Sequence, residues 1–523
     1  MTRSPDSSQP WWRDAVVYEV YVRSFADSGD DGEGDLAGVR SRLPYLRNLG
    51  VDALWLTPFY RSPLADGGYD VADYRAVDPR FGTLADFEAL VADAHDHGLR
   101  VIVDIVPNHT SNQHVWFQEA LASPPGSPAR DRYIFRTSPD DRPPNDWPSA
   151  FGGPAWTQVA DGEWYLHLYA PEQPDLNWHN AHVRAEFEDI LRFWLDRGAD
   201  GFRIDVAAGL FKDPNFADLR GGRPHAIGSP MYGRPEVHDV YRDWRRILDS
   251  YSSTGAERMA VGEVWSDDPA EVARFLRPDE LHQAFTFALQ LAPWSAEQFR
   301  TVVSDCLRVT APIHAAPTWV LSSHDAIRHR SRYEDSAGHG LDRVRAMLLF
   351  MLALPGSAYL YQGEELGLPE VFDLPDEARQ DPTFFRTHGA QLGRDGCRVP
   401  LPWSGDAPPY GFSTGTPWLP QPATWGSLSA AAQTGDPHSV LEFYRRALAL
   451  RRTLRDELPE TLEWLDAPNK DSLLFRRGDL RCLLNCGDDP VPLPDGAQIL
   501  LAGGSGTPAD GVLPGNSAAW LRG

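Results

Sequence analysis

Four short segments of the chain each end an apolar, strand-like run with a side chain that can carry charge. They are Asp104-Ile-Val-Pro-Asn-His109, Gly201-Phe-Arg-Ile-Asp205, Gly262-Glu263-Val-Trp265 and Ser322-Ser-His-Asp325. Hydrolysis of a glycosidic bond requires a carboxylate nucleophile, a protonated carboxyl group and side chains that hold the sugar ring. Because the segments lie far apart in sequence, only a fold that gathers strand ends can unite them.

Three carboxyl groups of these segments have surroundings that predict different roles. Arg203 lies two positions before Asp205 on a strand, so both side chains point to one side and the guanidinium favours an ionised nucleophile. Glu263 has apolar neighbours, which favour the protonated form that a general acid needs. Asp325, beside His324, could grip sugar hydroxyls. A salt bridge at a barrel rim is the alternative for any one residue, but four strand ends together favour catalysis.

The stretches between these motifs alternate helical and strand-like patterns. Thr83 and Asp86 have the spacing of a capping box, which predicts the start of a helix, and Gly98 stands where a left-handed residue would end it. The apolar positions in between have the spacing of one helix face: Phe87, Leu90, Val91 and Ala94. A second helix with the same pattern precedes the strand that ends at Asp205.

Eight strand-like runs separated by helical segments can be counted along the chain. They lie at 16–25, 51–58, 99–105, 201–206, 258–265, 282–289, 318–325 and 358–364. With right-handed crossovers, this α/β pattern predicts a closed parallel (β/α)8 TIM barrel. Such a barrel places its active site at the C-terminal ends of its strands, where the four segments lie.

Two regions break the alternation and predict further domains. Residues 110–176 are rich in Pro, Gly and Trp and lack helical periodicity, which indicates an inserted B subdomain. Residues 457–523 have short strands among turns, typical of a C-terminal antiparallel β-domain. The catalytic barrel is therefore predicted to comprise residues 1–109 and 177–456.

Composition limits the classes of partner. The chain has 523 residues, 42% of them hydrophobic and 24% charged, as in soluble globular proteins. A net charge of -25 disfavours nucleic-acid and anionic membrane partners. The sequence has no signal-peptide pattern and no apolar run of membrane length, and its four cysteines lack zinc or disulfide-scaffold spacing. We therefore expect a cytoplasmic protein, either a monomer or a homodimer.

The four segments resemble, in order, the signature regions of the α-amylase family of glycoside hydrolases, family 13. The resemblance covers nearly the whole chain and implies a retaining mechanism through a covalent glucosyl-enzyme intermediate, without a cofactor in catalysis. It implies that Asp205 is the nucleophile, Glu263 the acid/base and Asp325 the transition-state stabiliser. The same resemblance places three more side chains around the cleaved glucose: His109, Arg203 and His324.

Other stretches are similar to the α-glucosidase and oligo-1,6-glucosidase group of that family. These are Gly67-Gly-Tyr-Asp-Val-Ala-Asp-Tyr74, Gln173-Pro-Asp-Leu-Asn-Trp178 and Gly393-Arg-Asp-Gly-Cys-Arg-Val-Pro-Leu-Pro-Trp403. The resemblance implies that Asp70 and Arg398 pair across the pocket floor and bind the outermost 4-hydroxyl, which favours exo-attack on short chains. It also implies aromatic walls around that glucose, although core packing is the alternative for each ring: Tyr69, Phe151 and Tyr169.

The acidic loop from Asp27 to Asp35 alternates oxygen ligands as a hard cation requires. It is similar to a family loop that implies a structural Ca²⁺ or Mg²⁺ held by Asp27, Asp31, Asp35 and the carbonyl of Glu33. Gly29 replaces the usual Asn, so one ligand is missing, and a solvated acidic turn is the alternative interpretation.

The linkage specificity receives two conflicting indications. Val206 directly after the nucleophile resembles the α-1,6-specific branch, whereas Asp205 to Pro214 as a whole resembles actinobacterial α-glucosidases that act on α-1,4 links. We therefore expect an exo-α-glucosidase acting on maltose and other small α-glucosides, with α-1,4 links favoured. An oligo-1,6-glucosidase and a transglucosylase or trehalose synthase-like enzyme are the alternatives, whereas a non-catalytic transporter-associated subunit would lack the carboxylates.

Overall fold

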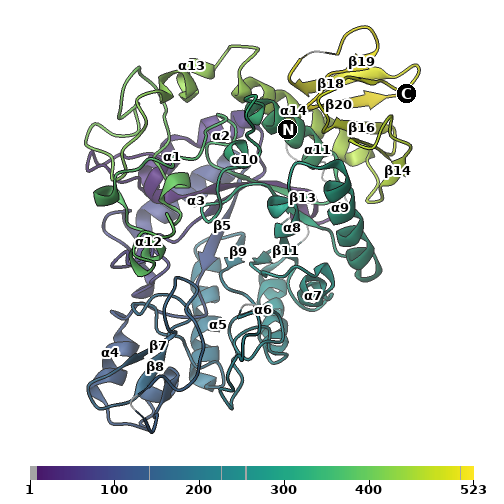
Figure 1. The fold of residues 1–523 in the computed structure, drawn as a ribbon. Coiled ribbons are helices and arrows are strands. Elements are labelled where there is room, and N and C mark those ends of the chain that lie inside the picture. Colours follow the sequence, from purple (N-terminus) through teal and green to yellow (C-terminus); the bar gives the residue numbers. More distant parts are fainter. Residues whose placement is uncertain (1–8, 141, 225, 254–255, 507) are drawn as a thin grey trace.

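A computed structural model describes residues 9–140, 142–224, 226–253, 256–506 and 508–523. Eight parallel strands close into a barrel in the order β1-β13-β12-β11-β10-β9-β5-β2 (Figure 1). The barrel strands are β1 (Val16–Val20), β2 (Ala53–Leu56), β5 (Arg100–Ile105), β9 (Gly201–Ile204), β10 (Met259–Gly262), β11 (Gln283–Thr286), β12 (Thr318–Val320) and β13 (Ser357–Tyr361). The predicted (β/α)8 barrel is confirmed.

Most of the predicted strands are longer than the observed ones, chiefly at their C-terminal ends. The first was expected to reach residue 25, but β1 ends at Val20 and a 3₁₀ turn, Val22–Ser24, follows. The run at 282–289 changes from strand β11 to helix α8 (Phe287–Leu291). Because strand ends turn into the loops that build a barrel's upper face, apolar character continues there after ladder hydrogen bonding has stopped.

Helices surround the barrel, and the start of α3 agrees with the prediction. Thr83 and Asp86 form the predicted capping box on α3, and Gly98 has a φ of 72° beyond its end. The helices are α1 (Leu36–Ser41), α2 (Leu43–Leu49), α3 (Leu84–Asp96), α4 (Val115–Ala122), α5 (Ala181–Leu195), α6 (Val237–Tyr251), α7 (Pro269–Ala273), α8, α9 (Ala296–Thr310), α10 (His329–Arg332), α11 (Gly340–Ala353), α12 (Pro382–Arg386), α13 (Ala430–Gln433) and α14 (Val440–Leu454).

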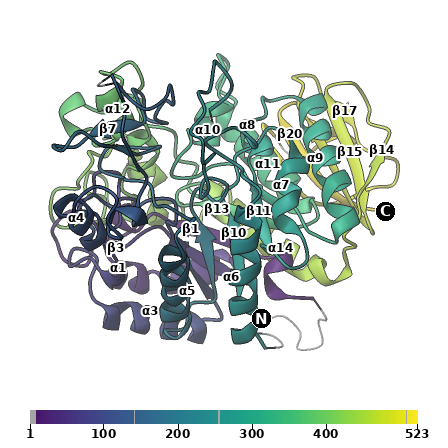
Figure 2. The ribbon, with the colours of Figure 1, turned by 90° about the horizontal axis from the view of Figure 1, so that it is seen from below.

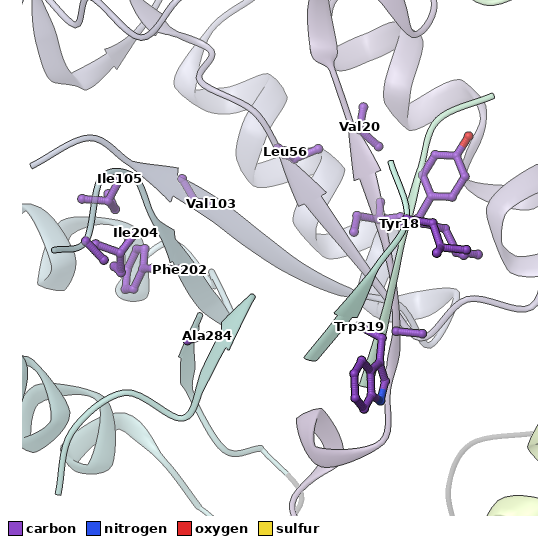
Figure 3. Close-up of a cluster of buried hydrophobic side chains, with 14 of the residues drawn as sticks. Tyr18, Val20, Leu56, Val103, Ile105, Phe202, Ile204, Ala284 and Trp319 are labelled. Atoms are coloured by element: carbon purple, nitrogen blue, oxygen red, sulfur yellow. The ribbon is translucent and has the colours of Figure 1, made fainter. Parts of the chain in front are cut away.

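Side chains of the barrel strands alternate between two apolar layers, as the pleat requires. One set packs outward against the helices, and Figure 3 labels part of it: Tyr18, Val20, Leu56, Val103, Ile105, Phe202, Ile204, Ala284 and Trp319. The other set fills the barrel interior, among them Val17, Ala53, Trp55, Ile102, Val261, Phe285 and Tyr359. Inward positions near the strand ends are therefore the ones that can carry functional groups.

Two additions lie on opposite sides of the molecule in both views (Figures 1 and 2). Within the predicted insert, α4 accompanies a small sheet in the order β6-β8-β7, formed by Phe135–Arg136, Trp164–Leu166 and Trp156–Gln158. A two-stranded sheet of β3 (Tyr60–Arg61) and β4 (Asp73–Val77) precedes it. The limits of this B domain stay a prediction.

The C-terminal region is an antiparallel sheet in the order β14-β15-β16-β20-β18, as expected. Its strands are β14 (Glu463–Leu465), β15 (Ser472–Arg477), β16 (Leu480–Asn485), β18 (Gln498–Gly504) and β20 (Ser517–Arg522), beside a pair formed by β17 (Val491–Pro492) and β19 (Val512–Leu513). Trp520 of β20 donates to the carbonyl of Leu349 in α11 at 2.8 Å, which fixes the sheet to the barrel. Among the described residues, no helix is long and apolar enough to cross a membrane.

Candidate active site

A single buried arginine joins the carboxyl groups of three barrel strands. Arg203, at the end of β9, is 2% exposed. Its Nη1 lies 2.6 Å from Oδ1 of Asp205 and 3.1 Å from Oδ1 of Asp104, and its Nη2 lies 2.9 Å from Oε2 of Glu263. The barrel thus brings the predicted nucleophile and the predicted acid/base onto adjacent nitrogens of one guanidinium.

The backbone after the nucleophile orients Glu263. Val206 has a φ of 46°, an unusual conformation for a β-branched residue, and its N–H donates to Oε2 of Glu263 at 2.9 Å. Trp265 donates from Nε1 to Oε1 of the same carboxyl group at 2.8 Å. Both oxygens of Glu263 are therefore held in place. Arg203 contacts this carboxyl group and that of Asp205 at the same time.

Burial and neighbouring charges act in opposite directions on the nucleophile. Burial raises the pKa of Asp205 well above its usual value, the carboxylates of Glu263 and Asp104 raise it further, and Arg203 lowers it. Burial likewise raises the pKa of Asp104 to about 7, against the effect of Arg203. Arg203 therefore acts in the direction expected from the sequence, but it does not outweigh desolvation.

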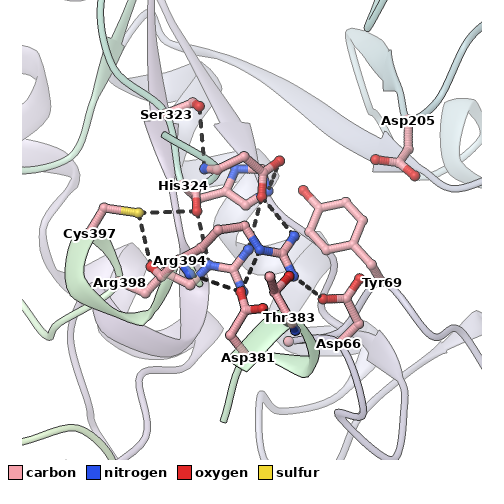
Figure 4. A network of polar contacts seen from close by, with 12 residues as sticks. Asp66, Tyr69, Asp205, Ser323, His324, Asp381, Thr383, Arg394, Cys397 and Arg398 are labelled. Atoms are coloured by element: carbon pink, nitrogen blue, oxygen red, sulfur yellow. Dashed lines mark hydrogen bonds and ion pairs between the residues drawn. The ribbon is translucent and has the colours of Figure 1, made fainter. Parts of the chain in front are cut away.

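A second arginine joins three further carboxylates in a separate network (Figure 4). Arg394 contacts Oδ1 of Asp66 at 2.5 Å, Oδ2 of Asp381 at 2.5 Å and Oδ1 of Asp325 at 3.0 Å. Arg398 also donates to Oδ1 of Asp325, at 2.9 Å. Burial raises the pKa of Asp325, but Arg394, Arg398 and Arg203 hold it below its usual range, so this carboxylate is ionised.

The predicted pairing of Asp70 with Arg398 is wrong. In the described part of the chain, the carboxylate of Asp70 accepts hydrogen bonds from the Ser62 hydroxyl at 2.9 Å and from the N–H groups of Ala65 and Asp66, both at 3.0 Å. Arg398 instead contacts Asp325 and the carbonyl of His324. The tight turn that contains Asp70 captures its carboxylate, because the turn's backbone N–H groups need acceptors.

The ion pair formed instead joins Asp66 with Arg394, each four residues earlier in the chain than the predicted partner. Gln173 extends it, because its amide donates to Oδ2 of Asp66 at 3.0 Å and lies 3.1 Å from Nε2 of His109. Burial lowers the pKa of His109 to about 4, so its imidazole is neutral.

The predicted aromatic residues lie beside these groups. Tyr69 stacks on His324 with ring centroids 5.1 Å apart, and its hydroxyl donates to Asp104 at 2.9 Å. Tyr169 packs between His109 and Phe151, at 5.3 Å and 5.5 Å. The guanidinium of Arg394 lies 4.8 Å from the ring centre of Phe151. The structure therefore gathers all three rings around the charged groups, and their contact with a sugar stays a prediction.

Comparison with known proteins identifies the family. Residues 19–458 match the alpha amylase catalytic domain, and residues 470–520 match a domain of unknown function, DUF3459. The chain belongs to the α-amylase family of glycoside hydrolases. Its catalytic domain therefore includes the barrel and both arginine-centred networks.

Relatives of this α-amylase family chain share most of its length. A probable alpha-glucosidase of Rhizobium meliloti strain 1021 is 38% identical over 511 residues, 92% of this chain and 91% of the relative. An oligo-1,6-glucosidase of Parageobacillus thermoglucosidasius is 35% identical and covers 84% of each chain. The crystal structure of the alpha-glucosyl transfer enzyme XgtA superposes with a TM-score of 0.89 at 37% identity, covering 99% of this chain and 100% of XgtA.

The acidic loop expected to hold a metal uses its carboxylates on its own backbone. Asp27 accepts from the N–H groups at positions 29, 30 and 32, and Asp35 caps α1 through Gly38 and binds Ser28. Asp31 accepts from the N–H of Glu33. Within the described residues, no three His, Cys, Asp or Glu side chains are grouped as metal ligands. The side chains do not form a ligand set, and the structural metal stays an unsupported prediction.

Several polar residues of this α-amylase family site were not singled out from the sequence. Lys212 is buried and contacts Oδ2 of Asp175 at 2.6 Å and Oδ1 of Asn108 at 2.7 Å. The sequence feature that could have identified Lys212 is its position as a lone lysine after the apolar residues 206–211 that follow the nucleophile. Arg394 lies inside a segment that the sequence did identify and Asp66 directly precedes another, but nothing local distinguishes them from Arg398 and Asp70.

Proposed function

We propose that the protein is a retaining exo-α-glucosidase that releases glucose from the non-reducing end of small α-glucosides. The observation that carries this proposal is the bridge that Arg203 makes between Asp205 and Glu263. Retaining hydrolysis needs two carboxyl groups roughly 5 Å apart, and two nitrogens of one guanidinium hold carboxylates close together.

In this mechanism the ionised Asp205 attacks the anomeric carbon while Glu263 donates a proton to the leaving oxygen. The glucosyl ester of Asp205 forms as the glycosidic bond breaks. Glu263, now ionised, takes a proton from water, and that water cleaves the ester and regenerates the free carboxylate. Asp325 stays ionised throughout and stabilises the positive charge that develops on the sugar ring.

Attack on the chain end is supported by the polar residues that surround one side of the pocket. Asp66, Arg394 and Gln173 form a connected set of hydrogen-bonding groups beside His109. Such groups can bind the hydroxyls of a terminal glucose. Activity on α-1,4 links, with Val206 as the contrary indication, belongs to the same proposal, as does a cytoplasmic location.

Transfer of glucose to another sugar is a second candidate, favoured by the similarity to the alpha-glucosyl transfer enzyme XgtA along 99% of the chain. The same residues would serve, with an acceptor hydroxyl in place of water. Product analysis at high maltose concentration separates the two: new oligosaccharides or trehalose indicate transfer, and glucose alone indicates hydrolysis.

Replacement of the nucleophile tests the proposal directly. Asp205→Ala should abolish release of glucose from maltose, isomaltose and p-nitrophenyl α-glucoside, while circular dichroism shows an intact fold. A time course with the wild-type protein on maltose, isomaltose, sucrose, trehalose and maltotriose would define the linkage. Substantial turnover by the Asp205→Ala protein would show that another group forms the ester.

A further inference from the structure

A carboxylic acid side chain lies inside the barrel at a position that no step above uses. Glu19 belongs to β1, whose five residues are all buried, and is itself 1% exposed. It pairs in register with Trp55 on β2 and Tyr361 on β13. Because Val17 belongs to the interior cluster, the pleat turns Glu19 inward as well. Burying a carboxyl group inside a barrel is costly unless it has partners.

The partner of Glu19 is His324, through two of that residue's nitrogens. The backbone N–H of His324 donates to Oε1 of Glu19 at 3.2 Å, and the imidazole Nδ1 forms a short contact with the same oxygen. A backbone N–H can only donate, so Oε1 is an acceptor. An oxygen that already accepts from this backbone N–H is best matched by a second donor, so we assign the proton of the second contact to Nδ1.

This assignment of the proton leaves Nε2 of His324 directed at the reacting groups. Burial lowers the pKa of His324 well below its usual value, so the ring is neutral and carries its single proton on Nδ1. Nε2 is buried, has no hydrogen-bond partner among the described residues and lies 3.1 Å from Oδ2 of Asp325. The other oxygen of Asp325 is held by Arg394 and Arg398.

Stacking alone would not choose this arrangement. Tyr69 and Tyr21 stack on the His324 ring at centroid distances of 5.1 Å and 5.9 Å, which fixes the ring plane. A ring held only by stacking can rotate within its plane or change tautomer. The contact with Glu19 is the one that distinguishes Nδ1 from Nε2.

We propose that Glu19 is a positioning residue that fixes the orientation and tautomer of His324, so that Nε2 and the free oxygen of Asp325 together accept hydrogen bonds from sugar hydroxyls. The activity part of this proposal rests on the proposed function, whereas the tautomer does not. The acceptor oxygen, and not a negative charge, is what the arrangement requires, because Oε1 accepts both bonds whether or not the other oxygen carries a proton.

The groups around Glu19 are consistent with a positioning role that does not require a negative charge on its carboxyl group. Burial raises the pKa of Glu19 well above its usual value. The charged groups that face it are Asp325 beyond β12, Arg203 on β9 and Asp104 on β5, two of them acidic. A carboxyl group near two carboxylates favours the protonated form, and with that proton on Oε2 the oxygen Oε1 still accepts both bonds from His324.

Two substitutions of Glu19 distinguish the effect of losing its acceptor oxygen from the effect of losing its charge. Glu19→Gln keeps an acceptor oxygen in the same place and should retain kcat within about threefold, with an unchanged pH profile. Glu19→Met has a similar length but no acceptor and should lower kcat about 10- to 100-fold, with a smaller change in KM, because a bond that orients a transition-state contact is lost. Glu365→Gln and Glu365→Met are matched controls, since Glu365 is equally buried and accepts from Tyr18 and Tyr45 at 2.8 Å away from the reacting groups.

The tautomer is measured without substrate. Long-range ¹H–¹⁵N NMR spectra, with the His324 signals assigned by difference against His324→Gln, should show Nδ1–H in the wild type and in Glu19→Gln, and a mixture in Glu19→Met. The proposal is overturned if the wild type carries the proton on Nε2, if Glu19→Met keeps wild-type kcat, or if Glu19→Gln loses as much as Glu19→Met. A wild type without glucosidase activity but with Nδ1–H would reject the proposed function and leave the positioning role of Glu19 standing.

Discussion

Removing the guanidinium of Arg203 is the perturbation with the largest expected effect on the site. Arg203→Met deletes the side chain that hydrogen-bonds Asp205 and that also contacts Asp104 and Glu263. Three carboxyl groups are then left around a buried space without their shared cation. Methionine fills most of the volume, so the change mainly tests charge and hydrogen bonding.

The magnitude follows from the burial of this cluster. Removing one partner of a buried ion pair costs roughly 3–5 kcal/mol, and the three contacts share one cation, so they do not add. If that loss appears in the transition state, kcat/KM falls on the order of 100- to 5,000-fold. The pKa of Asp205 also rises further, because Arg203 is the group that lowers it. The acid limb of the pH–rate profile should therefore move to higher pH.

The assay is kcat/KM for p-nitrophenyl α-glucoside between pH 4 and pH 9. Arg203→Lys serves as an intermediate, since a lysine keeps the charge but cannot contact several carboxylates with a planar fork. Arg343→Met is the matched control. Arg343 is also a buried arginine, bound to Asn516 at 2.7 Å and to the carbonyl of Tyr333 at 2.8 Å, but it lies on α11 away from the site.

One outcome would refute the reasoning. If Arg203→Met folds and keeps more than a tenth of wild-type kcat/KM with an unmoved acid limb, the bridge between the carboxylates has no catalytic role. A loss equal to that of Arg343→Met would point to general destabilisation instead.

Three further outcomes are expected. Asp66→Asn should lower kcat/KM for maltose about tenfold, because the ion pair with Arg394 at 2.5 Å becomes a weaker bond from the guanidinium to a neutral amide; steady-state kinetics checks this, and an unchanged value would exclude a part in substrate binding. Thr83→Ala should cost about 1 kcal/mol in urea unfolding through loss of the capping box with Asp86, with activity unchanged. In the wild type, activity should fall as pH drops through a pKa above the usual aspartate range, since Asp205 must be ionised to attack and burial raises its pKa; a limb near pH 4 would contradict this.

Local sequence patterns were sufficient to predict the alternation of strands and helices in the barrel, but not helices α4 and α8. The capping box of Thr83, the stop at Gly98 and the apolar face of α3 are all present in the structure. Such signals act over a few residues, so the sequence contains all of the interacting groups. The C-terminal ends of β1 and β11 were predicted several residues too far along the chain. An apolar run does not reveal where a strand stops hydrogen bonding to its neighbours.

The sequence by itself determined the identities of the charged residues at four strand ends, and with them the class of chemistry. Only the tertiary structure decided which charges meet. Asp66 rather than Asp70 pairs with Arg394, more than 300 positions away, because backbone N–H groups already surround Asp70. Likewise, a glutamate on β1 reaches His324 only when the barrel closes. Ion pairs depend on distance in space, and spacing along a chain does not record that distance.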